Sequence, residues 1–211
     1  MEADEVKVLM INGSPNEYGC TYTALQELEK TLEKHDIGTE ILYLGKKPIA
    51  GCLACSVCKK TGKCVWQDQV NAVVERLDTI DAIIIGSPVY YASASGQLTA
   101  FLDRLFYTAG GKMSRKLGAT VVSCRRGGAT AAFDQLNKYF TISNMPIVSA
   151  NYWNQVHGFT PDDVLKDEEG LQTMRVLGEN IAWLLKVIYA GREAGIPEPC
   201  YEEKIMTNFI R

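Results

Sequence analysis

The stretch DAIIIGSPVYY, residues 81–91, decides the fold, because it contains the clearest strand of the chain and the loop that follows it. The continuous apolar run at residues 82–85 is typical of a strand in a parallel sheet that is covered on both faces. The Gly, Ser and Pro of residues 86–88 predict a turn. Residues 98–106 then carry apolar side chains at the spacing of a core-facing helix. The order strand, loop, helix predicts an α/β unit.

The same unit recurs outward from this stretch in both directions. Strands are expected at residues 6–11, 39–44, 81–86, 117–124 and 147–152. Helices are expected at residues 21–35, 70–77, 98–106, 129–143 and 171–188. Five strands that alternate with helices predict right-handed crossovers and one parallel sheet with helices on both faces.

Two segments interrupt this alternation of strands and helices. Residues 45–68 are rich in Cys, Lys and Gly and read as an insertion after the second strand, and residues 195–211 read as an extended C-terminal tail. No internal repeat and no linker is found, so residues 1–211 are predicted to form a single domain.

Composition excludes several classes of protein. Hydrophobic residues make up 46% and charged residues 22% of the 211 residues, as expected of a chain that buries a core. A net charge of −3 argues against a nucleic-acid partner, because neutralising phosphates requires a basic surface. No apolar run approaches the roughly 20 residues that cross a membrane. The acidic residues 1–5 lack the pattern of a signal peptide, so a cytoplasmic protein is expected.

The loop at residues 13–21, GSPNEYGCT, connects the first strand to a helix N-terminus. Free backbone N–H groups and the helix dipole make such a place suitable for a phosphate group, to which Ser14 and Thr21 can add hydroxyls. It is not a Walker A loop, because Cys20 stands where the lysine belongs. The loop therefore fits a single phosphate, or it is an ordinary turn.

The loops after the third, fourth and fifth strands should lie at the same edge of the sheet, where ligands bind in such folds. Tyr90 and Tyr91 offer flat faces to a planar ligand, or they cover the sheet edge. Residues 124–128, CRRGG, bring two arginines and two glycines that permit close backbone approach. Residues 152–158 add aromatic and polar groups, and His157 is interpreted as structural.

Four of the seven cysteines form the run Cys52-x2-Cys55-x2-Cys58-x5-Cys64. An odd count in a chain without an export signal argues against a disulfide framework. The spacing is similar to the bacterial ferredoxin run, in which closely spaced thiolates hold an iron–sulfur cluster. We expect a [4Fe–4S] cluster, with zinc or empty reduced thiols as the alternatives.

The sequence resembles a known family. Residues 14–21, 87–91 and 96–98 with Asp103 and Arg104 are similar to the flavodoxin-like proteins of the NADPH-dependent FMN reductase group, and the cysteine run is similar to its iron–sulfur flavoproteins. The resemblance implies a flavodoxin-like, doubly wound, five-stranded parallel sheet of order 2-1-3-4-5 that binds FMN. It implies phosphate contacts from Ser14, Asn16, Gly19, Cys20 and Thr21, contacts to the isoalloxazine ring from Pro88, Val89, Tyr90 and Tyr91, and contacts to its pyrimidine side from Cys124, Arg125, Arg126, Gly127 and Gly128.

The function implied is an FMN-dependent oxidoreductase or electron-transfer flavoprotein. It would pass electrons between NAD(P)H or a ferredoxin-type donor and a quinone, flavin or other acceptor through FMN and a [4Fe–4S] cluster. The alternatives are a plain NAD(P)H-dependent FMN or quinone reductase without a cluster and a non-enzymatic electron carrier. No catalytic side chain is expected, because the flavin carries the chemistry. The resemblance also implies a homodimer or homotetramer.

Overall fold

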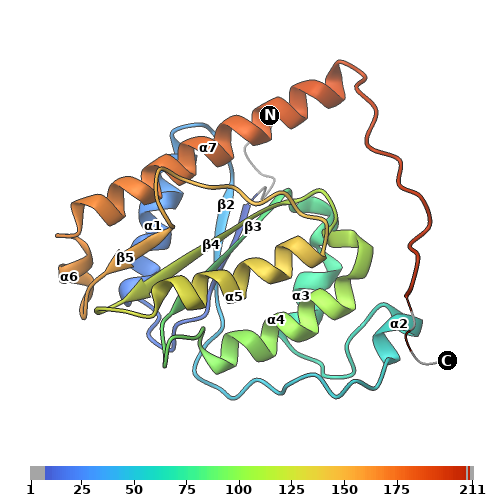
Figure 1. The fold of residues 1–211 in the computed structure, drawn as a ribbon, viewed down its shortest axis with the longest axis horizontal. Coiled ribbons are helices and arrows are strands. Elements are labelled where there is room, and N and C mark those ends of the chain that lie inside the picture. The colour runs from blue at the N-terminus through green and yellow to red at the C-terminus, as the bar shows by residue number, and fades with distance from the viewer. Residues whose placement is uncertain (1–7, 208, 210–211) are drawn as a thin grey trace.

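The computed structural model describes residues 8–207 and 209. It is a parallel sheet between two layers of helices (Figure 1). The strands are β1 (Val8–Asn12), β2 (Thr39–Tyr43), β3 (Ala82–Pro88), β4 (Leu117–Cys124) and β5 (Gln155–His157). The helices are α1 (Cys20–Glu33), α2 (Val57–Thr61), α3 (Gln69–Glu75), α4 (Gly96–Ala109), α5 (Ala129–Ile142), α6 (Pro161–Val164) and α7 (Glu168–Glu193), with 3-10 turns η1 (Leu77–Thr79) and η2 (Gly110–Met113).

The sheet has the order β2-β1-β3-β4-β5, which confirms the predicted fold. Val8 of β1 pairs with Thr39 on one side and with Ala82 on the other, and Ala82 pairs in turn with Leu117. The chain therefore moves outward from β1 to β2 and then crosses back to β3. This reversal of direction lies between β1 and β3, so the loops after these two strands flank the place where such folds bind ligands.

Alternate residues of each strand enter two separate cores, as the period of two in a strand requires. Ile83 and Ile85 pack into the core formed with α3, α4 and α5. Ala82 and Ile84 pack into the core formed with α1 and α7. All four are fully buried, which explains the continuous apolar run that marked this strand in the sequence.

The fifth strand is not where the sequence predicts it. The apolar residues 147–152 contribute only one parallel bridge, between Ile147 and Gly118, and the strand itself is Gln155–His157, which pairs with β4 from Val122 onward. Eight positions separate Ile147 from Gln155, whereas four separate Gly118 from Val122. The surplus chain loops out of the sheet, and the sequence prediction mistook this loop for the strand.

Two short helices were also missed. α2 lies inside the cysteine-rich insertion, and α6 begins at Pro161 after the N-cap Thr160, whose side chain and that of Asp163 form a capping box. The long helix α7 extends beyond the predicted 171–188 at both ends. Residues 196–207 contain no helix or strand. Within residues 8–207 and 209, no helix combines the length and the apolar character that crossing a membrane requires.

Candidate functional site

The loop between β1 and α1 is shaped by a side chain that the sequence reasoning missed. Asn12 is fully buried at the end of β1. Its Nδ2 donates to the Glu17 carbonyl at 2.9 Å, and its Oδ1 accepts the Ser14 N–H at 3.1 Å. The Ser14 hydroxyl then accepts the Asn16 N–H at 3.1 Å. A polar residue at the end of an apolar strand was the signal that could have found it.

The N-terminus of α1 is open to an anion. Gly19 is its N-cap and supplies no side-chain cap, and the first turn carries no acidic residue. The backbone N–H groups of Thr21 and Tyr22 have no acceptor among residues 8–207 and 209. Unpaired N–H groups and the positive end of the dipole form a phosphate site. The residues present therefore fit the phosphate group of a flavin nucleotide.

Two predicted phosphate residues make contacts that join this loop to other strands. The hydroxyls of Thr21 and Ser123 share a hydrogen bond of 2.8 Å, and both residues are buried. The Cys20 thiol lies 3.7 Å from the Gly158 carbonyl, which follows β5. Burial raises the pKa of the Cys20 thiol above its ordinary value, so the thiol is neutral at pH 7.

Serine hydroxyls hold the loop after β3 against the loop after β1. Ser95, the N-cap of α4, donates to the Gly13 carbonyl at 2.7 Å. The Ser87 hydroxyl accepts the Ser95 N–H at 3.1 Å. A Cβ on Gly13 would lie 2.7 Å from the Leu98 side chain, so only glycine allows this close approach. The two loops that flank the switch point therefore form one unit.

The two predicted aromatic residues lie on a tight hairpin. Tyr90 and Ser93 exchange two backbone hydrogen bonds of 2.9 Å. The residues between them, Tyr91 and Ala92, have φ of 51° and 58°, a left-handed conformation that costs energy in residues other than glycine. Tyr91 is fully exposed and Tyr90 is about half exposed (46%). Tyr91 therefore does not cover the sheet edge, which leaves it free for a ligand or a partner.

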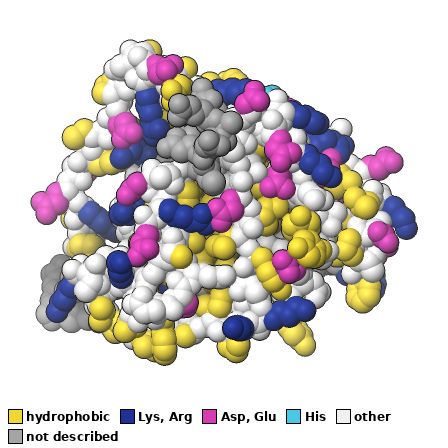
Figure 2. Space-filling model, turned by 180° about the vertical axis from the view of Figure 1, so that it is seen from behind, with side chains coloured by type: hydrophobic (Ala, Val, Ile, Leu, Met, Phe, Trp, Pro, Cys, Tyr) yellow, Lys and Arg dark blue, Asp and Glu magenta, His cyan; other side chains and the backbone are white. Residues whose placement is uncertain are grey.

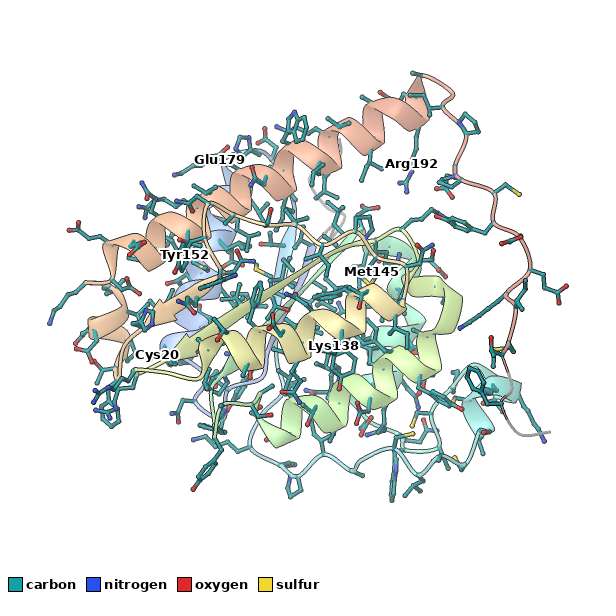
Figure 3. The ribbon with its side chains drawn as sticks, in the orientation of Figure 1. Cys20, Lys138, Met145, Tyr152, Glu179 and Arg192 are labelled. Carbon is teal, nitrogen blue, oxygen red and sulfur yellow. The ribbon has the colours of Figure 1, made fainter. Side chains whose placement is uncertain are left out.

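The loop after β4 contacts this hairpin through Gly128. Its φ is +86°, and a Cβ there would lie 2.8 Å from the Ala92 Cα and 3.2 Å from the Val89 side chain. The Cys124 carbonyl accepts the Gly158 N–H at 3.0 Å, which joins the loop after β5. The carboxyl ends of β1, β3, β4 and β5 thus form one connected edge. Cys20 lies at this edge and Arg192 toward the far end of α7 (Figure 3).

A cavity of about 560 Å³ lies at this edge, lined by Arg125, His157, Gly158, Phe159 and Asp163. Backbone hydrogen bonds from Thr160 and Phe159 hold the pKa of Asp163 below its ordinary value. Arg125 and Arg126 are both exposed, and neither forms an ion pair within the described part of the chain. Arg125 is therefore the predicted arginine that faces this cavity.

The insertion forms a second, separate site. The four cysteines line one small pocket together with Trp66, Arg104, Tyr107 and others, although the chain between them spans residues 52–64. The pocket lies beside the C-terminal half of α4. In Figure 1, α2 lies at the side of the molecule away from the arrowhead of β4. The cysteine pocket and the carboxyl edge are thus two different places.

The backbone of the insertion turns toward its own sulfur atoms. Ala54 and Ser56 have φ of 52° and 57°, and the Ala54 N–H points at the Cys52 Sγ at 3.5 Å. Hydrogen bonds to sulfur are a regular feature of iron–sulfur sites. Four thiols that line one pocket are the donor set of a thiolate-held cluster. Among the described residues, however, no three His, Cys, Asp or Glu side chains are arranged to hold a single metal ion.

The insertion is fastened along one face of α4. Gln97 Nε2 donates to the Gly45 carbonyl at 2.8 Å. One heptad later, Arg104 contacts the insertion again, with a side chain that is completely buried and donates to Asp68 through both Nη atoms, at 2.7 and 2.8 Å. Burial disfavours the guanidinium charge, but the Asp68 and Cys64 contacts outweigh that and raise the pKa of Arg104. Sequence reasoning assigned neither α4 residue a role in the insertion.

Comparison with known proteins assigns the family. Residues 6–160 match the model of the NADPH-dependent FMN reductase family. The chain belongs to this family. An iron–sulfur flavoprotein of Methanocaldococcus jannaschii is 33% identical over 191 residues, covering 87% of this chain and 99% of the relative. Another, from Methanosarcina thermophila, is 26% identical and covers 89% and 100%.

Solved structures agree on the fold of this FMN reductase family member. An NAD(P)H:quinone oxidoreductase from Methanothermobacter marburgensis superposes with a TM-score of 0.65 at 14% identity, covering 84% of this chain and 96% of that one. An archaeal flavodoxin superposes with a TM-score of 0.58 at 15% identity, covering 85% and 99%. The predicted resemblance is confirmed, and this family member is a flavin-dependent oxidoreductase that binds FMN.

Proposed function

We propose that the protein is an electron-transfer flavoprotein that carries both FMN and a [4Fe–4S] cluster, and passes electrons between NAD(P)H or a ferredoxin-type donor and a quinone, flavin or other acceptor. Bound FMN exchanges electrons in pairs or singly, and a bound cluster exchanges them one at a time. The observation that carries the proposal is the presence of two separate places in one chain: the connected carboxyl edge and the pocket that the four cysteines line.

At the carboxyl edge, the protein's task is to bind and orient the flavin. The N–H groups at the start of α1 would hold the phosphate, together with the loop of Ser14, Asn16 and Gly19. Pro88, Val89, Tyr90 and Tyr91 would line the isoalloxazine ring, and Cys124, Arg125, Arg126, Gly127 and Gly128 would approach its pyrimidine side. Tyr91 is fully exposed, which suits stacking of a planar nicotinamide or quinone.

Arg125 would stabilise negative charge on the reduced ring, because a nearby cation favours an anionic form. Its exposed guanidinium at the cavity edge supports this role. We assign no side chain at the edge a role as general acid or base, because the chemistry would reside in the cofactor. Burial raises the pKa values of the Cys20 and Cys124 thiols, and we assign neither thiol a role as a nucleophile.

At the insertion, Cys52, Cys55, Cys58 and Cys64 would supply four thiolates to the cluster. All seven cysteines of the chain are free, so none of the four is taken up by a disulfide bond. The thiols stay reduced in the cytoplasm, which is the compartment we infer.

The test is anaerobic reduction by NADH and by NADPH, followed through the flavin absorbance, with wild-type protein and with a Cys55→Ser/Cys58→Ser variant. We expect reduction of the flavin in both proteins, and transfer to a one-electron acceptor that is at least tenfold slower in the variant. Equal transfer rates in the two proteins would contradict a role for the cluster.

The second candidate is a plain NAD(P)H-dependent FMN or quinone reductase without a cluster. The observation that favours it is that Cys52 and Cys55 are exposed and that no metal-holding arrangement exists within residues 8–207 and 209. In that case purified protein contains FMN but no iron or sulfide.

Assembly into a homodimer or homotetramer is also part of the proposal. The insertion exposes Leu53, Val65 and Trp66, at 61%, 47% and 42%. Hydrophobic side chains gather along the lower edge of the molecule in Figure 2, the edge along which Figure 1 places the insertion. Exposed apolar groups of this kind mark contact surfaces. Sedimentation analysis tests this assembly, and a monomer at micromolar concentration would contradict it.

A further inference from the structure

Arg104 is the feature that the proposed function leaves unexplained. A completely buried arginine is rare and costly unless each of its donors finds an acceptor. A guanidinium has five N–H groups. Nε donates to the Cys64 Sγ at 3.2 Å, and Nη1 donates to the Ala50 carbonyl at 3.3 Å and to Asp68 at 2.7 Å. Nη2 donates to the Trp66 carbonyl at 3.4 Å and to Asp68 at 2.8 Å. All five donors are therefore used.

The acceptors lie on both sides of the cysteine run. Ala50 precedes the first cysteine, whereas Cys64, Trp66 and Asp68 are the last cysteine and the residues that follow it. One side chain therefore fastens the beginning and the end of the segment to α4. A lysine, with one nitrogen and no planar fork, cannot reproduce this set of contacts.

Asn71 also forms hydrogen bonds to Cys64, in this case to its backbone. Its Oδ1 accepts the Cys64 N–H at 2.7 Å, and its Nδ2 donates to the Cys64 carbonyl at 3.0 Å. Asp68, besides binding Arg104, accepts the Val70 N–H and so caps α3. The backbone of Cys64 is thus fixed from α3 and its sulfur from α4.

We propose that Arg104 is a positioning residue for the iron–sulfur cluster, which holds the two ends of the cysteine run together and raises the reduction potential of the cluster through its hydrogen bond to the Cys64 sulfur. This inference rests on the proposed function. A hydrogen bond to a ligating sulfur stabilises the more negative, reduced cluster. The cationic guanidinium acts in the same direction, and the Asp68 carboxylate opposes it.

The opposite charges of Arg104 and Asp68 predict that substitutions at these two residues shift the midpoint potential in opposite directions. Arg104→Lys keeps the positive charge but loses the fork and the hold on the Cys64 sulfur, so the midpoint potential of the cluster should fall. Asp68→Asn keeps Arg104 but removes the balancing negative charge, so the potential should rise. A merely structural role would move both variants in the same direction or neither. The measurement is a redox titration of the holoprotein followed by electron paramagnetic resonance, with iron and FMN content determined on each sample.

The matched control is Arg76→Lys. Arg76 forms a similar two-pronged pair with Glu40, with one contact of 2.6 Å, but touches no cysteine. Its substitution should leave the cluster potential unchanged. An unchanged potential in Arg104→Lys, or a fall in Asp68→Asn, would overturn the proposed effect on the potential.

Limited trypsin digestion tests the fastening role without using activity or potential. Lys59, Lys60 and Lys63 are exposed within the segment that Arg104 closes. Arg104→Lys and Asp68→Asn should both speed cleavage there, with about tenfold for the former, because local opening becomes easier when charge-assisted hydrogen bonds are lost. Cleavage at the wild-type rate in both variants would overturn the fastening role. Should Arg104→Lys fail to fold, as judged by lost FMN, Asp68→Asn alone decides both points.

The outcomes separate the two proposals. Wild-type protein without iron or sulfide contradicts the proposed cluster and, with it, the effect of Arg104 on a potential. Wild-type protein that carries the cluster, with an unchanged potential in Arg104→Lys, contradicts only the inference about Arg104.

Discussion

The carboxyl edge of the sheet and the cysteine-rich insertion are held in shape by different kinds of contact. The carboxyl edge is held by many short-range contacts of buried hydroxyls, backbone and glycines, such as Ser95 to Gly13 and Thr21 to Ser123. The insertion has little core of its own, exposes much of its apolar surface, and depends on the polar side chains of α3 and α4. We therefore expect the proposed flavin site to be formed before its ligand binds, and the proposed cluster site to be completed only by its ligand.

The largest expected effect is confined to the insertion. Cys55→Ser/Cys58→Ser removes two of four thiolates, so iron should fall from about four per chain to nearly none, because cubane clusters need four cysteines. FMN content should stay the same, since the two places are separate. Iron, sulfide and FMN assays on one sample measure this, with Cys200→Ser in the exposed tail as the control. Loss of FMN together with iron would show that the two regions depend on each other.

The second effect is confined to the carboxyl edge. Gly128→Ala places a Cβ 2.8 Å from Ala92 at a φ of +86°. The strain should cost about 1–3 kcal/mol of unfolding free energy, and weaken FMN binding by roughly tenfold or more. Denaturant unfolding and fluorescence titration with FMN measure the two quantities.

Gly127→Ala is the matched control for Gly128→Ala, because a Cβ at Gly127 meets open space. It should change stability by less than about 0.5 kcal/mol, as surface substitutions do. Equal effects of the two alanines on the free energy of unfolding would mean that the contact between the loops after β3 and β4 does not strain Gly128→Ala.

A smaller effect concerns charge at the flavin. Arg125→Ala/Arg126→Ala should lower the flavin midpoint potential, by the equivalent of roughly 1 kcal/mol, because exposed cations act through a high dielectric. Lys138→Ala on α5, distant from Cys20 in Figure 3, serves as the control and should leave the potential unchanged. A flavin potential that stays the same in the double variant would rule out this role for the arginines.

The smallest effect separates the thiols by their environment. Burial raises the pKa values of Cys20 and Cys124, so at a given pH less of each is the reactive thiolate. Their alkylation should be slow at pH 8 and should accelerate at a higher pH than that of a free thiol in the same buffer. Mass spectrometry of iodoacetamide-treated protein measures the rates of the two thiols. A pH profile equal to that of the free thiol would refute the assignment.

The sequence predicts the sheet because buried parallel strands leave long apolar runs, as residues 82–85 do. Its failure at residues 147–152 has the opposite cause, since an apolar loop resembles a strand unless the pairing with β4 is known. The loops of the proposed site were predicted from their Gly, Ser and aromatic residues. Asn12, Ser95 and Arg104 were assigned no role because their partners lie elsewhere in the fold. A lone arginine in the apolar pattern of α4 was the available signal.

The most direct test of two separate cofactor places in one chain is the absorption spectrum of protein purified without oxygen, with iron, sulfide and FMN assayed on the same sample. The account predicts flavin bands on a broad shoulder near 400 nm, roughly where iron–sulfur clusters absorb, with about four iron and one FMN per chain. Flavin bands with no iron and no sulfide would contradict it and leave a plain FMN-dependent reductase.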